Sequence, residues 1–183
     1  AAGANVVMSG RRKEVLAPEA DKIRIMGGNA EVEALDVSDA RAVKKVSGAI
    51  LARHGRVDIL VNSAGLNTPN RYWKNQTVEG WRDVIGINLD GSFYTTMAVI
   101  PAMRARKDGL IINVSSWAGI FHPKMTGAAY NASKHAVTAM TETINMEECT
   151  NGIRACAICP AEVATPIMDR RPVPPSSEDR ARM

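Results

Sequence analysis

Short aliphatic runs alternate with amphipathic stretches along this chain. Five runs are predicted to form β-strands, at residues 5–9, 30–37, 57–61, 110–115 and 153–159. Residues 59–61 and 110–112 carry only aliphatic side chains. Such runs are typical of parallel strands that are covered on both faces.

Amphipathic stretches separate these runs. Val43, Val46 and Ile50 share one face of a predicted helix. A later helix is expected to bury the stripe Ala132, Ala136, Met140 and Ile144. Glycines between a helical stretch and a strand are expected to be left-handed and to end the helix: Gly27, Gly28, Gly55, Gly109 and Gly152. This repeat predicts an α/β domain with a mostly parallel sheet.

The composition is that of one globular domain. The 183 residues are 45% hydrophobic and 23% charged, which is enough for one core. The net charge of +4 is spread along the chain without a basic block, so no nucleic-acid partner is expected. No apolar run reaches the roughly 18 residues of a membrane span, and no signal peptide opens the chain. We therefore expect a soluble, cytoplasmic protein with no membrane partner.

Three cysteines, Cys149, Cys156 and Cys159, lie near the end of the chain. An odd number in this arrangement does not form a disulfide framework. Cys156 and Cys159 form a C-x-x-C pair, but residues three apart on a strand point to opposite faces. The second half of a zinc site is also missing. We expect these two thiols to pack in the core, and we expect no metal site.

Tyr130 and Lys134 carry the strongest chemical signal, because residues four apart on a helix share one face. A tyrosine that acts as a base at neutral pH needs its pKa lowered from about 10 towards 7, which is about 4 kcal/mol. A cation about 4 Å away supplies about this much at an effective dielectric constant near 20. Lys134 is therefore expected to lower the pKa of Tyr130. The alternative is a surface pair on an amphipathic helix.

Other polar and small residues follow the predicted strands, where open α/β sheets bind ligands. Ser115 and Ser116 end one strand, and the segment Asn-Ser-Ala-Gly at 62–65 ends another. Asn88 stands in an apolar helical stretch. A buried amide is costly unless it is hydrogen-bonded, so Asn88 is expected to form a local hydrogen bond or to join a polar network.

Taken in order, these residues resemble the classical short-chain dehydrogenases/reductases. The matches cover nearly the whole chain: Asp36-Val37, Asn62-Ser-Ala-Gly65, Asn88, Ser116, Tyr130-x-x-x-Lys134 and Pro160-Ala-Glu-Val-Ala-Thr165. Each match is weak by itself, but their order and spacing together are specific. The resemblance implies a Rossmann fold, a doubly wound parallel sheet in three αβα layers with the strand order 3-2-1-4-5-6.

The resemblance also implies roles. Tyr130 is the expected general acid and base, while Lys134 lowers its pKa and holds the nicotinamide ribose. Ser116 hydrogen-bonds the substrate oxygen, and Asn88 anchors a water that links Lys134 to solvent. Ser115 is expected to be structural, because the family pattern Ser-x-x-Gly, counted back from Gly119, points to Ser116. The expected cofactor contacts are Asp36 and Val37 at the adenine, Asn62, Ala64 and Gly65 at the adenosine ribose and phosphates, and Pro160, Val163 and Thr165 at the carboxamide.

The chain departs from the family pattern in two ways. Ala161 stands where the family usually has glycine. The glycine-rich phosphate loop and the first strand are expected before Ala1, and a helix and a final strand after Met183. We therefore expect one Rossmann-type domain, 1–183, that is incomplete at both ends, with a sheet divided where strand one is missing.

The cofactor preference depends on the loop after the first predicted strand. An acidic residue there holds the ribose hydroxyls of NAD, whereas an arginine accommodates the 2′-phosphate of NADP. Here the strand ends in Ser9-Gly10-Arg11-Arg12, with two guanidinium groups and no acid. NADP(H) is therefore favoured over NAD(H), with Arg11 as the phosphate partner. The alternative is a solvated loop.

The leading hypothesis is an NADP(H)-dependent oxidoreductase that interconverts a secondary alcohol and a ketone, with a small molecule as its substrate. The alternatives are a non-catalytic nucleotide- or partner-binding protein on the same scaffold, and an inactive fragment. By resemblance, the enzyme is expected to be a homotetramer or homodimer, with the helices that carry Asn88 and Tyr130 at the interface.

Several residues stay open between a functional and a structural role. Trp73, Trp117 and Phe121 either line a substrate pocket or pack in an ordinary lid or interface. Arg170 and Arg171 either attract an acidic substrate or lie in a solvated loop.

Overall fold

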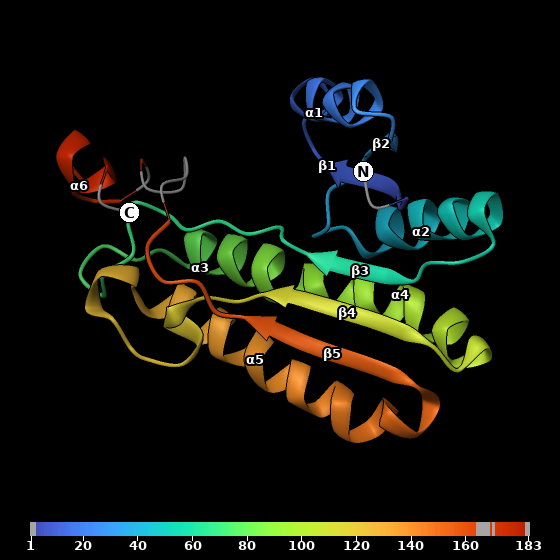
Figure 1. Ribbon diagram of the computed structural model, residues 1–183. Helices are drawn as coiled ribbons and strands as arrows, with labels where there is room; N and C mark the ends of the chain where they lie inside the picture. Colours follow the sequence, from blue (N-terminus) through green and yellow to red (C-terminus); the bar gives the residue numbers. More distant parts are fainter. Residues whose placement is uncertain (1–2, 164–168, 170, 182–183) are drawn as a thin grey trace.

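Five parallel β-strands alternate with helices in the computed structural model, which describes residues 3–163, 169 and 171–181 (Figure 1). The strands form two sheets, β1 (Asn5–Gly10) with β2 (Asn29–Ala34), and β3 (Ile59–Asn62), β4 (Gly109–Val114) and β5 (Ile153–Ile158) in that order. Every pair is parallel. The predicted α/β, Rossmann-like fold is confirmed, and each strand lies on a predicted run.

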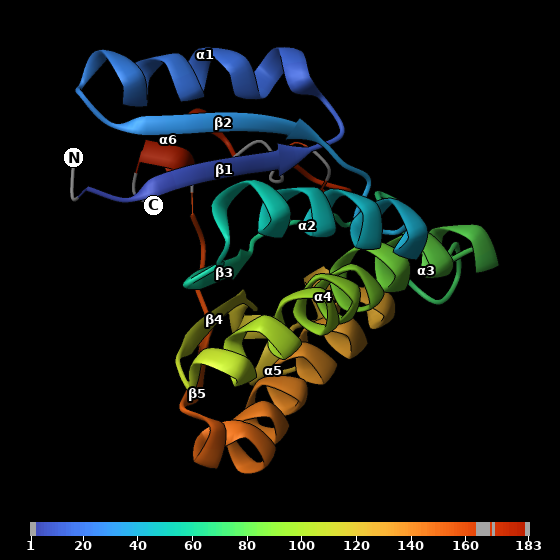
Figure 2. The same ribbon diagram turned by 90° about the vertical axis from the view of Figure 1, so that its right-hand side faces the viewer.

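The sheet is divided between β1 and β3. In the described ranges, β1 pairs only with β2 and β3 only with β4, and Figure 2 shows two separate groups of strands. This is the order that a doubly wound sheet has on either side of its first strand. The backbone groups along these two edges are available to a further strand.

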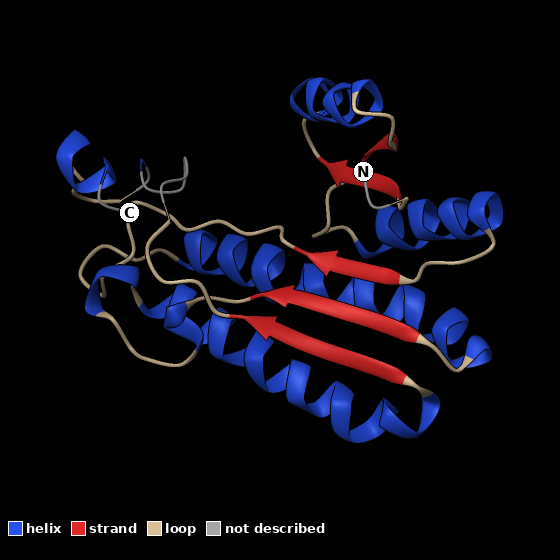
Figure 3. Ribbon diagram, viewed as in Figure 1, coloured by secondary structure: helices blue, strands red, loops and turns tan. Residues whose placement is uncertain are grey.

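Helices cover the two sheets differently. Helix α1 (Lys13–Ile25) packs on β2, and α2 (Ala40–His54) lies on the other side of the same sheet, against α4 (Gly91–Arg106) (Figure 2). Helices α4 and α5 (Ala128–Glu148) lie on one face of β3–β5 (Figure 3). The expectation that these strands are covered on both faces is not met in the described residues. Ile59, Val61 and Ile158 are about half exposed (55%, 53% and 47%).

The remaining helices are short. Helix α3 (Val78–Ile85) continues through a π-helical turn (Gly86–Asp90) into α4, and α6 (Ser177–Ala181) lies near the end of the chain. Single 3₁₀ turns occupy Trp117–Gly119, Lys124–Thr126 and Cys149–Asn151. Among the helices that the structure describes, none combines the length and the hydropathy of a membrane span.

The main core lies between α4, α5 and the sheet, and consists of Val99, Ile100, Met103, Ile111, Ile144 and Ile153. Gly109 begins β4 directly against Met103, where a Cβ would lie 2.6 Å from Met103 Cγ. The predicted left-handed conformation is wrong for Gly109 and for Gly28. Before β4, Lys107 is the left-handed residue that ends the helix, with a φ of 58°. The prediction is confirmed for Gly27, Gly55 and Gly152.

The buried stripe of α5 is shifted by one position from the predicted one. The buried residues include Ala129, Ser133, Val137, Thr141 and Ile144, so that only Ile144 is shared. Thr141 is buried because its hydroxyl donates to the Val137 carbonyl (2.7 Å) and accepts from Asn113 (2.8 Å). Hydrogen bonds of this kind allow polar residues into the core, which apolar periodicity does not reveal.

A close contact joins the loop after β2 to the start of α4. A Cβ built on Gly91 would lie 2.6 Å from Val37 Cγ2 and 3.3 Å from the Val37 carbonyl oxygen. Glycine is needed at position 91 for space and not for its backbone conformation, because its φ of −59° is ordinary.

Gly91→Ala is expected to lower the free energy of unfolding by about 1–3 kcal/mol, since the added methyl overpacks this contact. Gly48→Ala is the matched control, because Gly48 lies in α2 with nothing near its Cβ position. That change is expected to raise the free energy of unfolding by about 0.5–1 kcal/mol. Urea unfolding measures both, and equal effects in the two variants would contradict the packing argument.

Candidate active site

The predicted site residues gather at the carboxyl ends of the strands. Arg11 follows β1, Asp36 and Val37 follow β2, Ala64 and Gly65 follow β3, Ser116 follows β4, and Pro160 and Val163 follow β5. The arrowheads of β3, β4 and β5 point to the same side of the molecule (Figure 1). Thr165 lies outside the described residues. This edge is where open α/β sheets bind ligands.

Asn88 lies in the π-helical turn between α3 and α4 and is 1% exposed. Its Oδ1 accepts from the Leu66 N–H (2.8 Å), and its Nδ2 donates to the Leu66 carbonyl (3.0 Å) and to Ser133 Oγ (3.1 Å). The expected polar network is therefore present. Asn88 fixes the loop after β3 against α5, and single π turns of this kind are frequent at functional sites.

Lys134 lies beside Asn88. A Cβ built on Gly65 would lie 3.5 Å from Asn88 Oδ1 and 3.6 Å from Lys134 Nζ. The amide oxygen and the ammonium group therefore converge on one short stretch of backbone that carries no side chain. Lys134 is 5% exposed, and its Nζ donates to the Val114 carbonyl at 2.8 Å.

Burial lowers the pKa of Lys134 to about 8, against a smaller opposite effect from Cys159. Removal from water disfavours the charged form of an amine. The Nζ atom lies over the ring of Tyr130, 5.6 Å from the ring centroid. This is within the range of a cation–π contact.

Tyr130 is half-buried, and burial raises its pKa above the ordinary value. A hydrogen bond with the Ser116 side chain and the positive charge of Arg71 lower the pKa by smaller amounts. The expectation that Lys134 lowers this pKa is not met, because burial dominates and the ammonium lies over the ring face. The predicted grouping of Tyr130, Ser116, Lys134 and Asn88 in one cluster is present.

The two serines after β4 have different tasks. Ser116 caps the 3₁₀ turn by accepting from the Ala118 N–H (3.1 Å), and its hydroxyl faces Tyr130. Ser115 is 3% exposed, and its Oγ donates to the Lys134 carbonyl (3.0 Å), so its predicted structural role is confirmed. A Cβ on Gly119 would lie 2.8 Å from the same carbonyl oxygen. The close approach of this turn to α5 thus explains the glycine.

Asn62 points into the core. Its Nδ2 donates to Asn113 Oδ1 (2.9 Å) and to Thr96 Oγ1 (3.2 Å), and its Oδ1 accepts from Thr95 (2.7 Å). Its side chain is used inside the protein, so any contact of Asn62 with a cofactor comes from its backbone. Asn113 completes this network from β4. It was not identified from the sequence, although an amide inside an aliphatic strand is a usable signal.

Arg11 and Asp36 approach each other beyond the ends of β1 and β2. Arg11 Nη1 lies 4.0 Å from Asp36 Oδ2, and both side chains are exposed. Asp36 Oδ1 accepts from the Ser38 hydroxyl (2.6 Å) and N–H (3.0 Å). These hydrogen bonds and the nearby charge of Arg11 hold the pKa of Asp36 below its usual value.

Arg71 is a site residue that the sequence did not reveal, because a single arginine in a loop has no periodic signature. It lies in the loop after β3, is 4% exposed, and its charge acts on Tyr130. The predicted aromatic residues are divided. Trp117 and Phe121 pack together with ring centroids 5.5 Å apart, whereas Trp73 is 84% exposed.

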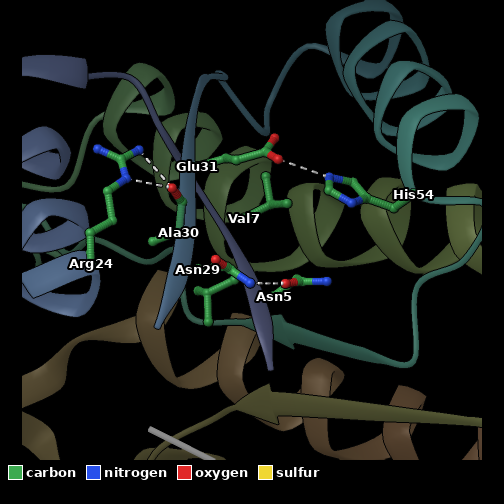
Figure 4. A pocket seen from close by; sticks show the side chains of 8 residues that line it. Asn5, Val7, Arg24, Asn29, Ala30, Glu31 and His54 are labelled. Carbon is green, nitrogen blue, oxygen red and sulfur yellow. Dashed lines mark hydrogen bonds and ion pairs between the residues drawn. The ribbon is translucent and has the colours of Figure 1, made fainter. Parts of the chain in front are cut away.

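A separate hollow of about 310 Å³ lies at the amino ends of β1 and β2 (Figure 4). Arg24 donates to the Ala30 carbonyl there, and His54 pairs with Glu31 at 3.2 Å (Figure 4). It lies at the opposite end of the strands from Tyr130 and does not belong to the catalytic cluster.

The cysteines are not all in the core. Cys156 is exposed on β5, contrary to the predicted packing, because no helix of the described part covers that face, and Cys159 is partly buried. In the ranges that the structure describes, no three His, Cys, Asp or Glu side chains are grouped as metal ligands.

A family model described as short chain dehydrogenase matches residues 1–173. The chain is 36% identical over 168 residues to a 3beta-hydroxysteroid dehydrogenase of Mediterraneibacter gnavus, covering 92% of this chain and 60% of that protein. It is 34% identical over 171 residues to the 3-oxoacyl-[acyl-carrier-protein] reductase FabG of Thermotoga maritima, covering 93% and 68%. The chain thus spans about three-fifths to two-thirds of the length of these relatives.

Solved structures give the same result. A gluconate 5-dehydrogenase from Burkholderia cenocepacia, in complex with NADP and tartrate, has a TM-score of 0.84 at 32% identity, over 90% of this chain and 64% of that one. A short chain dehydrogenase/reductase from Burkholderia phymatum, in complex with NAD, has a TM-score of 0.84 at 30% identity, over 94% and 62%. With the match over residues 1–173, these likenesses show that the chain belongs to the short-chain dehydrogenase family.

Proposed function

We propose that this protein interconverts a secondary alcohol and a ketone by hydride transfer with NADP(H), with Tyr130 as the general acid and base. The observation that carries the proposal is the cluster of Tyr130, Ser116, Lys134 and Asn88 at the carboxyl edge of the parallel sheet. Its parts are held by buried hydrogen bonds, which is what a pre-organised catalytic site requires.

Tyr130 and Ser116 form the proton-transfer end of the site. Their hydroxyl groups already interact, so both can hydrogen-bond one substrate oxygen. Because burial raises the pKa of Tyr130, its phenol is protonated at neutral pH. A protonated phenol donates to a ketone oxygen, whereas alcohol oxidation requires it to lose its proton first. At neutral pH the phenol is therefore in the form that ketone reduction requires.

Lys134 holds a positive charge beside Tyr130. Its ammonium lies over the ring, and the Val114 carbonyl holds it there. Below pH 8 this group carries its charge despite its burial. Asn88 fixes the backbone at Leu66 and the hydroxyl of Ser133, so it holds the loop beside Lys134 in place.

The residues at this edge fit a nicotinamide dinucleotide, whose nicotinamide supplies or accepts the hydride when bound. Ala64 and Gly65 are exposed, and position 65 lacks the side chain that would separate its backbone from Asn88 and Lys134. Lys134 would hold the nicotinamide ribose, and Pro160 and Val163 follow β5 at the same edge.

At the other end of the cofactor site, Asp36 and Val37 would contact the adenine. Arg11, exposed beside Asp36, would hold a 2′-phosphate, which supports NADP(H) over NAD(H). Structures similar to this chain were solved with each of the two cofactors, so the preference rests on Arg11.

We also propose that the protein is a homodimer or homotetramer. Phe93 and Met97 lie one turn apart on α4 and are 47% and 54% exposed. Exposed apolar side chains on one helix face are typical of an association surface.

Tyr130→Phe is expected to lower kcat for ketone reduction by about 10²–10⁴-fold, because the variant has no proton to donate. NADPH binding, followed by cofactor fluorescence, is expected to stay unchanged. Tyr94→Phe, a partly buried tyrosine of α4, is the matched control and is expected to retain activity. Wild-type turnover in Tyr130→Phe would exclude the proposed mechanism and favour a non-catalytic role for the cluster.

Arg11→Ala is expected to raise KM for NADPH about tenfold and to leave KM for NADH nearly unchanged, because a charge-assisted hydrogen bond to phosphate is worth about 1.5–3 kcal/mol. Arg12→Ala is the control, since it changes the same charge one residue away. Steady-state kinetics with NADPH and with NADH measures both KM values in each variant. Equal effects of the two substitutions would show general electrostatic attraction in place of a specific contact.

Lys134 predicts a pH dependence of stability. Its pKa is about 8 in the folded protein and near 10.5 when unperturbed, so between these values the unfolded chain binds the extra proton and the free energy of unfolding rises with pH. Relative to Lys134→Met, the free energy of unfolding of the wild type is expected to rise by about 3 kcal/mol from pH 8 to pH 10.5. This gain is lost again as the pH falls back to 8.

Urea unfolding of both proteins over this pH range is the measurement. Lys44→Met, at an exposed position of α2, should run parallel to the wild type throughout. If the free energy of unfolding of Lys134→Met also changed with pH in parallel with the wild type, Lys134 would have an ordinary pKa in the folded protein.

A further inference from the structure

A cavity of about 680 Å³ lies beside the first turn of α5. Its walls come from the loop after β3 and from the segment that leads into α5, and it is lined by Arg71, Tyr72, Trp73, Lys74, Lys124, Gly127, Ala128 and Asn131. Ala128 and Asn131 stand on either side of Tyr130 in the sequence. The cavity therefore borders the helical turn that carries the proposed acid and base.

The lining of this cavity is strongly positive. Of the eight described residues that line it, Arg71, Lys74 and Lys124 are basic and none is acidic. The whole chain has 23 basic and 19 acidic residues, so the imbalance is local. A hollow with walls of one charge sign focuses the electric field on its contents, and here the field favours a negatively charged group.

Arg71 is firmly held in the wall. Its Nε donates to the Thr68 carbonyl at 2.7 Å, and its Nη1 donates to the Met125 carbonyl at 3.4 Å. Gly127 has a φ of 77°, and a Cβ there would lie 2.7 Å from Arg71 Cβ, so the chain leaves space for the arginine at this point. These carbonyls fix the direction of the guanidinium, whose positive charge attracts an anion.

Arg71 also connects the cavity with the reaction centre. The pKa of Tyr130 is raised most by burial, and it is lowered by the Ser116 hydrogen bond and by the charge of Arg71. The guanidinium therefore lies within electrostatic range of the phenol. The cavity and the phenol therefore share one charged neighbour, although Tyr130 is not among the described residues that line the cavity.

We propose that Arg71, Lys74 and Lys124 form a subsite for an anionic group of the substrate. The enzyme accordingly prefers oxo and hydroxy compounds that carry a carboxylate or a phosphate over their neutral analogues. This inference rests on the proposed function, because the reaction at Tyr130 is the one whose substrate it specifies.

The shape of the site favours a small molecule over the acidic surface of another protein. Arg71 is 4% exposed at the wall of a hollow, where a flat protein surface does not reach. Such a surface would meet only the exposed Lys74 and Lys124. Tyr72 and Trp73 line the same cavity and offer apolar contact to the carbon skeleton of a small substrate.

Substrate pairs that differ only in charge test the proposal. Reduction by NADPH is compared for acetoacetate and its methyl ester, and for dihydroxyacetone phosphate and dihydroxyacetone. The wild type is expected to have the higher kcat/KM for the anion in at least one pair, and the pair with the larger ratio identifies carboxylate or phosphate as the group. A ratio near one in both pairs would overturn the proposal.

Variants of Arg71, Lys74 and Lys124 show which of these residues cause the preference for the anionic substrate. Arg71→Gln is expected to lower the anion-to-neutral ratio at least about tenfold, mainly through KM for the anion, since hydrogen bonds to charged groups are lost. Arg71→Lys should retain part of the ratio. The double variant Lys74→Gln/Lys124→Gln changes only exposed side chains, so a smaller loss there is not a folding defect. Lys44→Gln on α2 is the matched control. Ratios that stay at the wild-type value in every variant would overturn the assignment.

A binding measurement separates this proposal from the proposed function. Trp73 lines the cavity, so its fluorescence is followed while the protein is titrated with inorganic phosphate or with acetate. The variant Trp73→Phe identifies the part of the signal that comes from Trp73. Saturable quenching that is lost in Arg71→Gln supports the subsite, even if no ketone is reduced and the proposed function fails. Ketone reduction without anion preference or saturable binding would overturn the subsite alone. Binding of an acidic protein in place of these small anions would also overturn it.

Discussion

The ammonium group of Lys134 lies inside the protein. The last residue of β4 and the residue that follows it bind the side-chain end and the backbone of Lys134. The Val114 carbonyl accepts from its Nζ, and the Ser115 hydroxyl donates to its backbone carbonyl. Burial of a charged amine is costly, and it lowers the pKa of Lys134 to about 8. The position of α5 against the end of β4, and with it the position of Tyr130, follows from this pair of contacts.

Polar residues extend from this point through the layer between the sheet and the helices. Asn88 reaches from the π-helical turn to Ser133 on α5 and to the loop after β3. Asn62 and Asn113 join β3 to β4 and to both flanking helices. A network whose members are satisfied by one another fixes a single arrangement of the elements more sharply than apolar packing does. The catalytic cluster thus lies at the end of a buried polar layer.

The sequence was sufficient for the strands and for the grouping of Tyr130 with Lys134, because both depend on local pattern. Aliphatic runs marked the five strands, and the spacing of Tyr130 and Lys134 required only a helix. The buried stripe of α5 was misplaced by one position, because Ser133 and Thr141 are buried through hydrogen bonds and not through hydrophobicity. The pKa of Tyr130 could not be predicted, since it depends on burial, which no local pattern contains.

In the proposed function, chemistry and selectivity are carried by different parts of the chain. Lys134 and Ser116 belong to α5 and to the end of β4, where the buried network tolerates little change. Arg71 belongs to the loop after β3, and carbonyls of that loop and of the turn before α5 orient it. Lys134 and Arg71 both act on Tyr130 or lie over it, but the hydrogen bonds of Arg71 lie outside the network of Asn88, Asn62 and Asn113. Loops held by a rigid scaffold vary more freely than its core, so the substrate can change in this architecture while the proton transfer stays the same.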